Sequence, residues 1–127
     1  MTLEERIKKS KTRVFKAIFP NVTNHYNTLF GGMAMLLMDE VAFITATRFS
    51  RRQMVTVGSD KVDFKKSIAT GTIIELVGEV THVGHTSLRV QVDIFVEQMY
   101  SSKRGKAATG AFSLVAIDED KNPIPVS

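Results

Sequence analysis

Asp39 is the polar residue whose surroundings in the sequence are hardest to reconcile with a purely structural role. If the segment around it is helical, the residues three and four positions away are all apolar: Met35, Leu36, Ala42 and Phe43. A carboxylate with such neighbours loses hydration unless it is paired or lines a cleft, and in a cleft it is a candidate base or nucleophile. Glu40 has equally apolar neighbours, so spacing alone leaves open which acid is chemical and which is structural.

Two consecutive glycines, Gly31 and Gly32, precede these acids and follow the polar segment Asn24–Thr28. Glycine permits close approach of the backbone, and the first N–H groups of a helix have no acceptor within it and carry the positive end of its dipole. Together these features can bind an oxyanion or a phosphate. The alternative is that the glycines only allow a tight turn into a crowded helix.

Other common catalytic and metal-binding patterns are not found in the sequence. There is no cysteine, which excludes a thiol nucleophile, a thiolate metal site and a disulfide scaffold. His25, His82 and His85 do not have metal-ligand spacing, and no G-x-S-x-G elbow, P-loop or dinucleotide fingerprint is present. His25 could act as a general base, although a loop histidine is more often a surface residue. We expect neither a metal nor a cofactor.

These residues require a helix to position them, and the sequence predicts one of about 18 residues within the range 31–50, longer than the usual 11–12 or so. Its apolar residues lie on all sides, which is typical of a helix enclosed by protein or crossing a membrane. Asp39 and Glu40 lie in the middle, where an aspartate costs about 2.5–3.5 kcal/mol in a bilayer. We therefore expect the helix to be enclosed by protein.

The rest of the chain predicts strands, one before the helix and four after it. Their expected ranges are Arg13–Phe19, Met54–Phe64, Thr72–Val83, His85–Met99 and Lys106–Asp118. Gly58-Ser59 indicates a bulge or a close backbone approach, and Gly84-His85 indicates a type II′ hairpin turn. In the fourth strand one face is apolar, formed by Leu88, Val90, Val92, Ile94 and Val96.

Short connections predict antiparallel neighbours, and a sheet that curls around the helix gives an α+β fold. One sheet covers only part of a helix, so we expect the remaining helix surface to contact another subunit, in a dimer or a multiple of dimers. The 127 residues predict one domain, with 1–12 and 119–127 peripheral.

The net charge of +4 comes from basic clusters at 6–13, 51–52, 65–66 and 103–106. Such clusters attract polyanions or are solvated surface, and none is interleaved with aromatic residues as in a nucleic-acid platform. The charged N-terminal segment is not followed by an apolar core, which argues against a secretory signal. We expect a cytoplasmic protein that binds neither nucleic acid nor membrane.

The segment Asn24–Gly32 followed by Met38-Asp39-Glu40 resembles the signature of the cytosolic acyl-CoA hydrolase branch of the hotdog thioesterases. The resemblance covers most of the chain from about Arg13 onward and continues through further matching positions: Val55-Thr56-Val57, Phe64, Gly71, Val83–Ser87 and Val115–Asp118. The family implies a five-stranded antiparallel sheet wrapped around one long helix, in dimers that often assemble into hexamers. One departure is Asn27, where the family usually has glycine; asparagine tolerates left-handed geometry.

The resemblance also implies an active site at a dimer interface, with Asn24 from one subunit and Asp39 from the other as catalytic residues. It selects Asp39 over Glu40 and implies that the Gly32 N–H is the oxyanion donor. We assign substrate binding to seven further positions: Phe30, Gly31, Thr56, Thr86, Ser87, Arg104 and Lys106. The last four of these are expected to contact CoA.

The predicted reaction is hydrolysis of an acyl-CoA to the free acid and CoA, in which Asp39 activates water as a general base or attacks directly. We expect replacement of Asp39 to abolish turnover and replacement of Glu40 mainly to affect folding. The alternatives are an acyl-CoA-binding module without turnover, a hotdog dehydratase or hydratase, which usually has a histidine on the helix, and a nucleic-acid binder.

Overall fold

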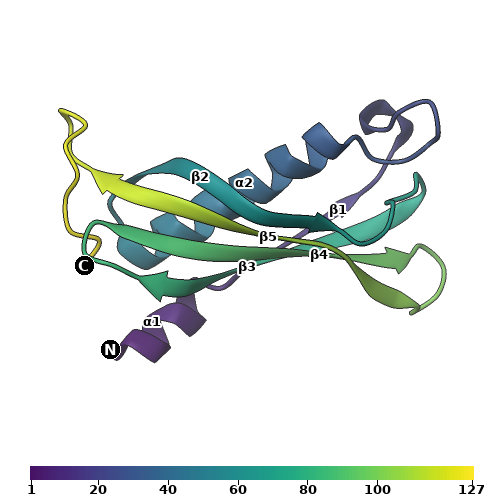
Figure 1. Cartoon of the computed structure of the whole chain (residues 1–127). Coiled ribbons are helices and arrows are strands. Elements are labelled where there is room, and N and C mark those ends of the chain that lie inside the picture. The colour runs from purple at the N-terminus through teal and green to yellow at the C-terminus, as the bar shows by residue number, and fades with distance from the viewer.

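A computed structural model describes every residue of the chain, from Met1 to Ser127, as one antiparallel sheet with a long helix on one face (Figure 1). The strand order is β1-β3-β4-β5-β2, and all neighbouring strands are antiparallel. This confirms the predicted α+β hotdog fold. In chain order the elements are α1 (Leu3–Ser10), β1 (Thr12–Ala17), a 3-10 turn (Pro20–Val22), α2 (Gly31–Ser50), β2 (Gln53–Phe64), β3 (Thr72–Val83), β4 (Ser87–Gln98) and β5 (Arg104–Ile117).

The helix α2 is held close to the sheet at two glycines on the strands beneath it. A Cβ at Gly78 of β3 would collide with the Thr45 hydroxyl and would lie 2.9 Å from Val41 Cγ1, and a Cβ at Gly110 of β5 would lie 3.0 Å from Met38 Cε. Any larger residue at Gly78 would therefore push the helix off the sheet. Neither glycine was identified from the sequence, because their partners lie in a distant segment.

The sheet covers only one side of α2, as predicted, so the helix is not fully enclosed within one chain. The side against the sheet is buried at Ala34, Met38, Val41, Ala42, Thr45, Ala46 and Phe49. On the other side Leu36 is 57% exposed and Phe43 is 45% exposed. No helix of the structure is long and apolar enough to span a lipid bilayer.

The strand β2 forms one edge of the sheet and lies beside α2. Its pairing with β5 shifts register between Thr56 and Gly58 and again between Asp60 and Asp63. The predicted bulge is therefore present, but its extra residue is Val57, one position before the predicted Gly58-Ser59. A Cβ at Gly58 would meet nothing within 4 Å, which contradicts the alternative of a close backbone approach. Val55 and Val57 are 39% and 61% exposed. The outer side of β2 therefore has no partner strand and is partly apolar.

The predicted type II′ turn at Gly84-His85 is wrong. Such a turn needs a positive φ at its first central residue, and Gly71 is the one glycine with positive φ. Three residues, Gly84–Thr86, connect β3 to β4 instead. The loop is wider because its carbonyl groups accept hydrogen bonds from other segments, the His85 carbonyl from Val126 N–H and the Thr86 carbonyl from Ala116 N–H, each at 3.0 Å.

Candidate active site between α2 and β2

An open groove of about 440 Å³ lies between α2 and the bulged part of β2. Its lining residues are Gly32, Met35, Leu36 and Asp39 from the helix, Thr56, Val57, Gly58 and Ser59 from β2, and Phe112 from β5. Met35 and Leu36 lie three and four positions from both Gly32 and Asp39, so the four helical residues form one side of two helical turns. The groove therefore contains both the predicted oxyanion donor and the predicted catalytic acid.

The carboxylate of Asp39 is half-buried in this groove, and its hydrogen-bond partner comes from β2. Thr56 Oγ1 donates a hydrogen bond of 2.7 Å to Asp39 Oδ1, and Oδ2 accepts none. No lysine or arginine lies within ion-pair distance of either oxygen. The purely structural alternative required a bond to the backbone or to a cation. One oxygen of Asp39 is instead free to accept a proton from a molecule bound in the groove.

Glu40 has no hydrogen bond or ion pair, and its side chain is exposed. It lies on the side of α2 that the sheet does not cover. Its apolar neighbours three and four positions away are therefore half-buried or exposed themselves, and they do not bury the carboxylate. Within one chain Glu40 therefore has no structural partner, and its predicted role in folding stays a prediction. The two adjacent acids differ because Thr56 faces only Asp39.

The first turn of α2 leaves three backbone donors free. The first hydrogen bond at this end runs from Ala34 N–H to Phe30 O at 2.9 Å, and the N–H groups of Gly31, Gly32 and Met33 have no acceptor. Phe30 is the N-cap residue and provides no side-chain acceptor. Cβ atoms at the two glycines would meet nothing within 4 Å, so crowding inside the chain does not explain them. The free donors suit an oxyanion at the groove.

Asn24 organises the loop before α2. Its Oδ1 accepts hydrogen bonds from Tyr26 N–H at 2.9 Å and from the N–H and hydroxyl of Thr28 at 3.2 and 3.1 Å. Asn27 has φ 61°, which confirms that asparagine here takes the left-handed conformation expected for glycine. The Nδ2 group of Asn24 donates to no group of the chain, and Asn24 does not line the groove. One chain does not bring Asn24 to Asp39.

The remaining predicted substrate-binding residues lie outside the groove of their own chain, except for Thr56. Phe30 is 50% exposed beside Gly31 at the start of α2. Thr86 and Ser87 lie at the β3–β4 turn, and Ser87 pairs with Val115 of β5.

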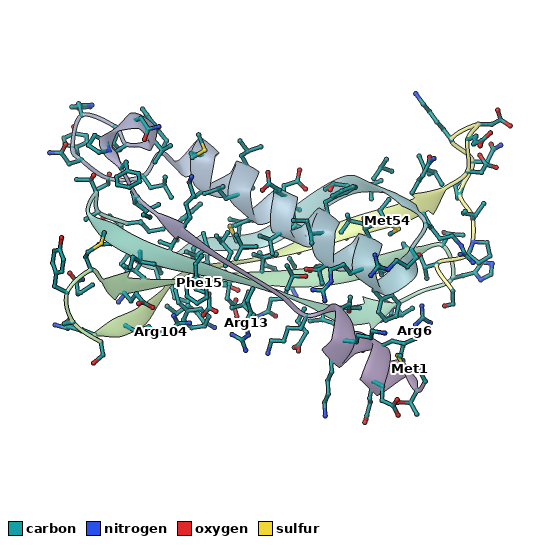
Figure 2. The ribbon with its side chains drawn as sticks, turned by 180° about the vertical axis from the view of Figure 1, so that it is seen from behind. Met1, Arg6, Arg13, Phe15, Met54 and Arg104 are labelled. Atoms are coloured by element: carbon teal, nitrogen blue, oxygen red, sulfur yellow. The ribbon has the colours of Figure 1, made fainter.

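Arg104 and Lys106 lie on the face of the sheet opposite α2. Arg104 pairs with Glu75 and lies 3.3 Å from Glu97, and Lys106 lies 3.5 Å from Asp93. Figure 2 shows Arg104 in the same part of the molecule as Arg13, which pairs with the same buried Glu75. These cations are already neutralised within the chain. Lys106 is eight residues from the β5 partner of Thr56, a distance of roughly 26 Å along the strand.

Two features of the groove were not foreseen from the sequence. Thr56 was assigned to substrate binding, yet its hydroxyl is used to hold Asp39. Phe112 and Ser59, which pair across β5 and β2, form part of the lining. The alternation of β5 indicates that Phe112 faces inward, but the register that places Ser59 beside it depends on the bulge in β2.

Comparisons with known proteins point to one enzyme family. A model of the "Thioesterase superfamily" matches residues 26–103. An uncharacterized acyl-CoA thioester hydrolase from Bacillus subtilis is 40% identical over 119 residues, which cover 94% of this chain and 69% of that protein. The solved acyl-CoA hydrolase from Staphylococcus aureus, in complex with butyryl coenzyme A and coenzyme A, is 37% identical with a TM-score of 0.90, covering 94% of this chain and 73% of that one. An apo-hexameric acyl-CoA thioesterase gives a TM-score of 0.91 at 35% identity, covering 94% and 76%.

The S. aureus hydrolase has also been solved with alanine in place of an asparagine, an aspartate and a threonine. In that chain 15 residues separate the asparagine from the aspartate, and 17 separate the aspartate from the threonine. The same intervals, 15 and 17 residues, separate Asn24 from Asp39 and Asp39 from Thr56. The three polar residues singled out in this chain thus have counterparts at identical spacing.

Proposed function

The chain belongs to the thioesterase superfamily, and from this premise we infer that it is an acyl-CoA thioester hydrolase acting at the groove between α2 and β2. The observation that carries the site assignment is Asp39 in that groove. Its carboxylate is held by Thr56 at 2.7 Å, lacks a cation, and shares the groove with Gly32 at the uncapped start of the helix. We also propose a cytoplasmic location, with which a cysteine-free chain is compatible.

In the proposed reaction the thioester carbonyl oxygen accepts a hydrogen bond from Gly32 N–H. This donor stabilises the negative charge that develops on the oxygen when the carbonyl carbon is attacked. Asp39 Oδ2 removes a proton from a water molecule, and the water oxygen bonds to the carbonyl carbon. The carbon–sulfur bond then breaks, CoA leaves as the thiolate, and the proton held by Asp39 goes to the sulfur. The products are the free acid and CoA.

Thr56 is a positioning residue in this scheme. Its hydroxyl fixes Asp39 Oδ1, so the second oxygen keeps one orientation in the groove instead of rotating. The matching threonine interval in the S. aureus hydrolase supports this assignment. We assign Asn24 to orienting the water or the carbonyl through its free Nδ2 donor, because its Oδ1 is occupied by the loop.

We propose that a second copy of the chain completes each site. The partly apolar outer edge of β2 and the exposed Leu36 and Phe43 of α2 form a continuous surface that two copies can bury. Antiparallel pairing of two β2 strands would join the sheets and bring Asn24 of the second copy toward the groove. The hexameric thioesterase supports further assembly into a hexamer. Thr86, Ser87, Arg104 and Lys106 remain predicted contacts of CoA in such an assembly.

The test is acyl-CoA hydrolysis, followed with a chromogenic thiol reagent over a panel of acyl chain lengths. Asp39→Asn keeps the size and the Thr56 hydrogen bond but removes the base, so we expect kcat to fall by about 10² to 10⁴. Asp120→Asn is the matched control, because it makes the same substitution at an exposed aspartate whose side chain has no partner, and we expect it to remain folded and active. Glu40→Gln removes the neighbouring charge beside Leu36 and Phe43, and we expect it to keep turnover and to affect folding or assembly. Binding of acyl-CoA by the wild type without thiol release would instead identify a binding module.

The chemical role of Asp39 is testable by one turnover in ¹⁸O-labelled water with enzyme in excess. With Asp39 as a base, the label appears in the fatty acid and never in the protein. Direct attack would form a mixed anhydride, and water attack on the aspartyl carbon would leave ¹⁸O in the peptide that contains Asp39. Label found by mass spectrometry in that peptide after a single turnover would identify direct attack by Asp39 followed by hydrolysis at the aspartyl carbon.

A further inference from the structure

A second hollow, of about 180 Å³, lies where α1 packs against the C-terminal end of α2. Four of its six lining residues are cationic, and the set is Met1, Arg6, Lys9, Arg48, Phe49 and Arg51. Figure 2 shows Arg6 of α1, and Met1 just before α1, beside this end of α2. Arg48 and Arg51 follow Asp39 by 9 and 12 residues, roughly 14 and 18 Å along the helix axis, so the hollow is separate from the groove.

None of these four cations has an acidic partner. The seven ion pairs of the chain use six other cations: Lys11, Arg13, Lys65, Arg89, Arg104 and Lys106. Glu4 and Glu5 lie in the first turn of α1, but neither lines the hollow and neither makes an ion pair. The positive charge of the hollow is therefore not neutralised, whereas charge on the sheet surface is.

Capping of helix ends explains two of the four cations. Arg6 Nη2 donates to Phe49 O at 3.0 Å, and its guanidinium lies 4.3 Å above the Phe49 ring. Arg48 donates to Lys9 O at 2.9 Å, to Lys11 O and Thr12 Oγ1 at 3.1 Å each, and to Ser10 O at 3.4 Å. A guanidinium has five donors, so these bonds fix the orientation of both groups and leave further N–H groups free. Capping does not explain the side chains of Lys9 and Arg51.

Arg51 occupies a backbone position that favours glycine. It is the C-cap of α2, with φ 59° and ψ 23°, and its N–H donates to Thr47 O at 2.7 Å. Helices commonly end with a left-handed glycine because a side chain there is strained. An arginine at this position, with its side chain in the lining of a hollow that holds three other unpaired cations, indicates a role for the cation itself.

We propose that the hollow formed by Arg6, Lys9, Arg48 and Arg51 binds the phosphate or diphosphate group of a small molecule. Fixed guanidinium forks match phosphate oxygens, and the Lys9 ammonium adds a further charge. The group has two sources in the chemistry of this protein. It is either the nucleotide phosphates of a CoA substrate, bound in the same assembly, or a separate phosphorylated ligand.

The binding test is titration calorimetry with inorganic pyrophosphate at constant ionic strength, with sulfate as a control for general anion binding. Arg51→Gly removes one cation and relieves the left-handed strain, so the variant is not expected to unfold. We expect its affinity for pyrophosphate to fall about tenfold. Lys121→Gly is the matched control, since Lys121 also has a left-handed φ of 66° and does not line the hollow. Its affinity should stay within about twofold of wild type.

The source of the phosphate is tested with two substrates, an acyl-CoA and the acyl-pantetheine that lacks the nucleotide phosphates. If the hollow holds CoA, Arg51→Gly raises KM for the acyl-CoA only; if it holds a separate ligand, both KM values are unchanged although pyrophosphate binding is weaker. The binding measurement does not require turnover, so it stands apart from the proposed hydrolysis. Equal affinity in wild type and Arg51→Gly, or no binding beyond that of sulfate, would overturn the proposal.

Discussion

The two ends of α2 differ in how their backbone hydrogen-bonding groups are used. At the N-terminal end no side chain caps the helix, the first turn contains no acidic residue, and the three N–H groups of 31–33 have no acceptor. At the C-terminal end Arg51 N–H donates to Thr47 O at 2.7 Å, and the Arg6 side chain donates to Phe49 O at 3.0 Å. One end is open to a ligand, and the other is closed by the chain itself.

We therefore expect the N-terminal end of α2 to matter for activity and the C-terminal end to matter for stability. Terminal backbone groups are ordinarily satisfied by caps or water, so an uncapped end beside a groove is available for a substrate oxygen. The capped end instead fixes α1 to α2 through Arg48, which donates to carbonyl groups of Lys9, Ser10 and Lys11. Substitutions at the N-terminal end should change kinetics, and substitutions at the C-terminal end should change the free energy of unfolding.

Of the substitutions at the two ends of α2, those at the open end should reduce activity most. Gly32→Pro removes the proposed oxyanion donor, and proline is tolerated in the first turn of a helix because the N–H there has no helical acceptor. We expect kcat to fall about 10² to 10³. The Tm is compared with that of the control, because proline disfavours the helical conformation of the preceding Gly31. Gly31→Pro is the control, since it removes the neighbouring N–H after Phe30, whose ψ of 136° suits a residue before proline. Equal losses in both variants would show that the helix start, and not one donor, is required.

The capped end should respond in the opposite way. Arg48→Met keeps an apolar stem of similar length but removes the hydrogen bonds to α1, so we expect the free energy of unfolding to fall by about 2 kcal/mol. The kcat of Arg48→Met should stay within about twofold of wild type, because Arg48 lies roughly 14 Å from Asp39 along the helix. Arg52→Met is the control, because Arg52 is exposed and makes no hydrogen bond. Urea denaturation of the three proteins checks this prediction.

A smaller kinetic effect is expected from the residue that holds Asp39. Thr56→Val preserves shape and removes the 2.7 Å hydrogen bond, so the carboxylate loses its fixed orientation. We expect kcat to fall about tenfold while KM stays nearly constant, which corresponds to about 1.4 kcal/mol. Thr81→Val, at an exposed position of β3 without a hydrogen bond, is the matched control. A change confined to KM would place Thr56 in substrate binding, as the sequence alone predicted.

The sequence predicted the elements that are set by local patterns. Alternation in the range 85–99 defined β4 to within two residues, and the proline-free apolar run defined α2. Without the family resemblance, the sequence did not show which of Asp39 and Glu40 is the catalytic acid, because packing decides which side of α2 faces β2. The type II′ turn predicted at Gly84-His85 was wrong because hydrogen bonds from the distant Val126 and from Ala116 widen the loop.

The site was predictable in its residue types and less so in its geometry. Gly32, Asp39 and Thr56 meet in one groove of a single chain. Asn24 and Arg104 do not reach it within one chain, and the contribution proposed from a second copy leaves no signal in the contacts of a single chain. The two basic clusters at 6–13 and 51–52 looked like unrelated surface charge, since only the packing of α1 on α2 brings Arg6 and Arg51 to the same hollow.

At the capped end, one substitution should raise the free energy of unfolding, whereas Arg48→Met should lower it. Arg51→Gly removes a side chain from a left-handed position, so we expect the free energy of unfolding to rise by about 1 kcal/mol, measured by urea denaturation in phosphate-free buffer. The same variant should bind pyrophosphate more weakly, so added pyrophosphate should raise its Tm less than that of wild type. A residue that lowers stability in the free protein and raises it with a ligand present is placed for binding. If Arg51→Gly is less stable than wild type without any anion, the side chain stabilises the helix end directly, and the C-terminal end of α2 is structural alone.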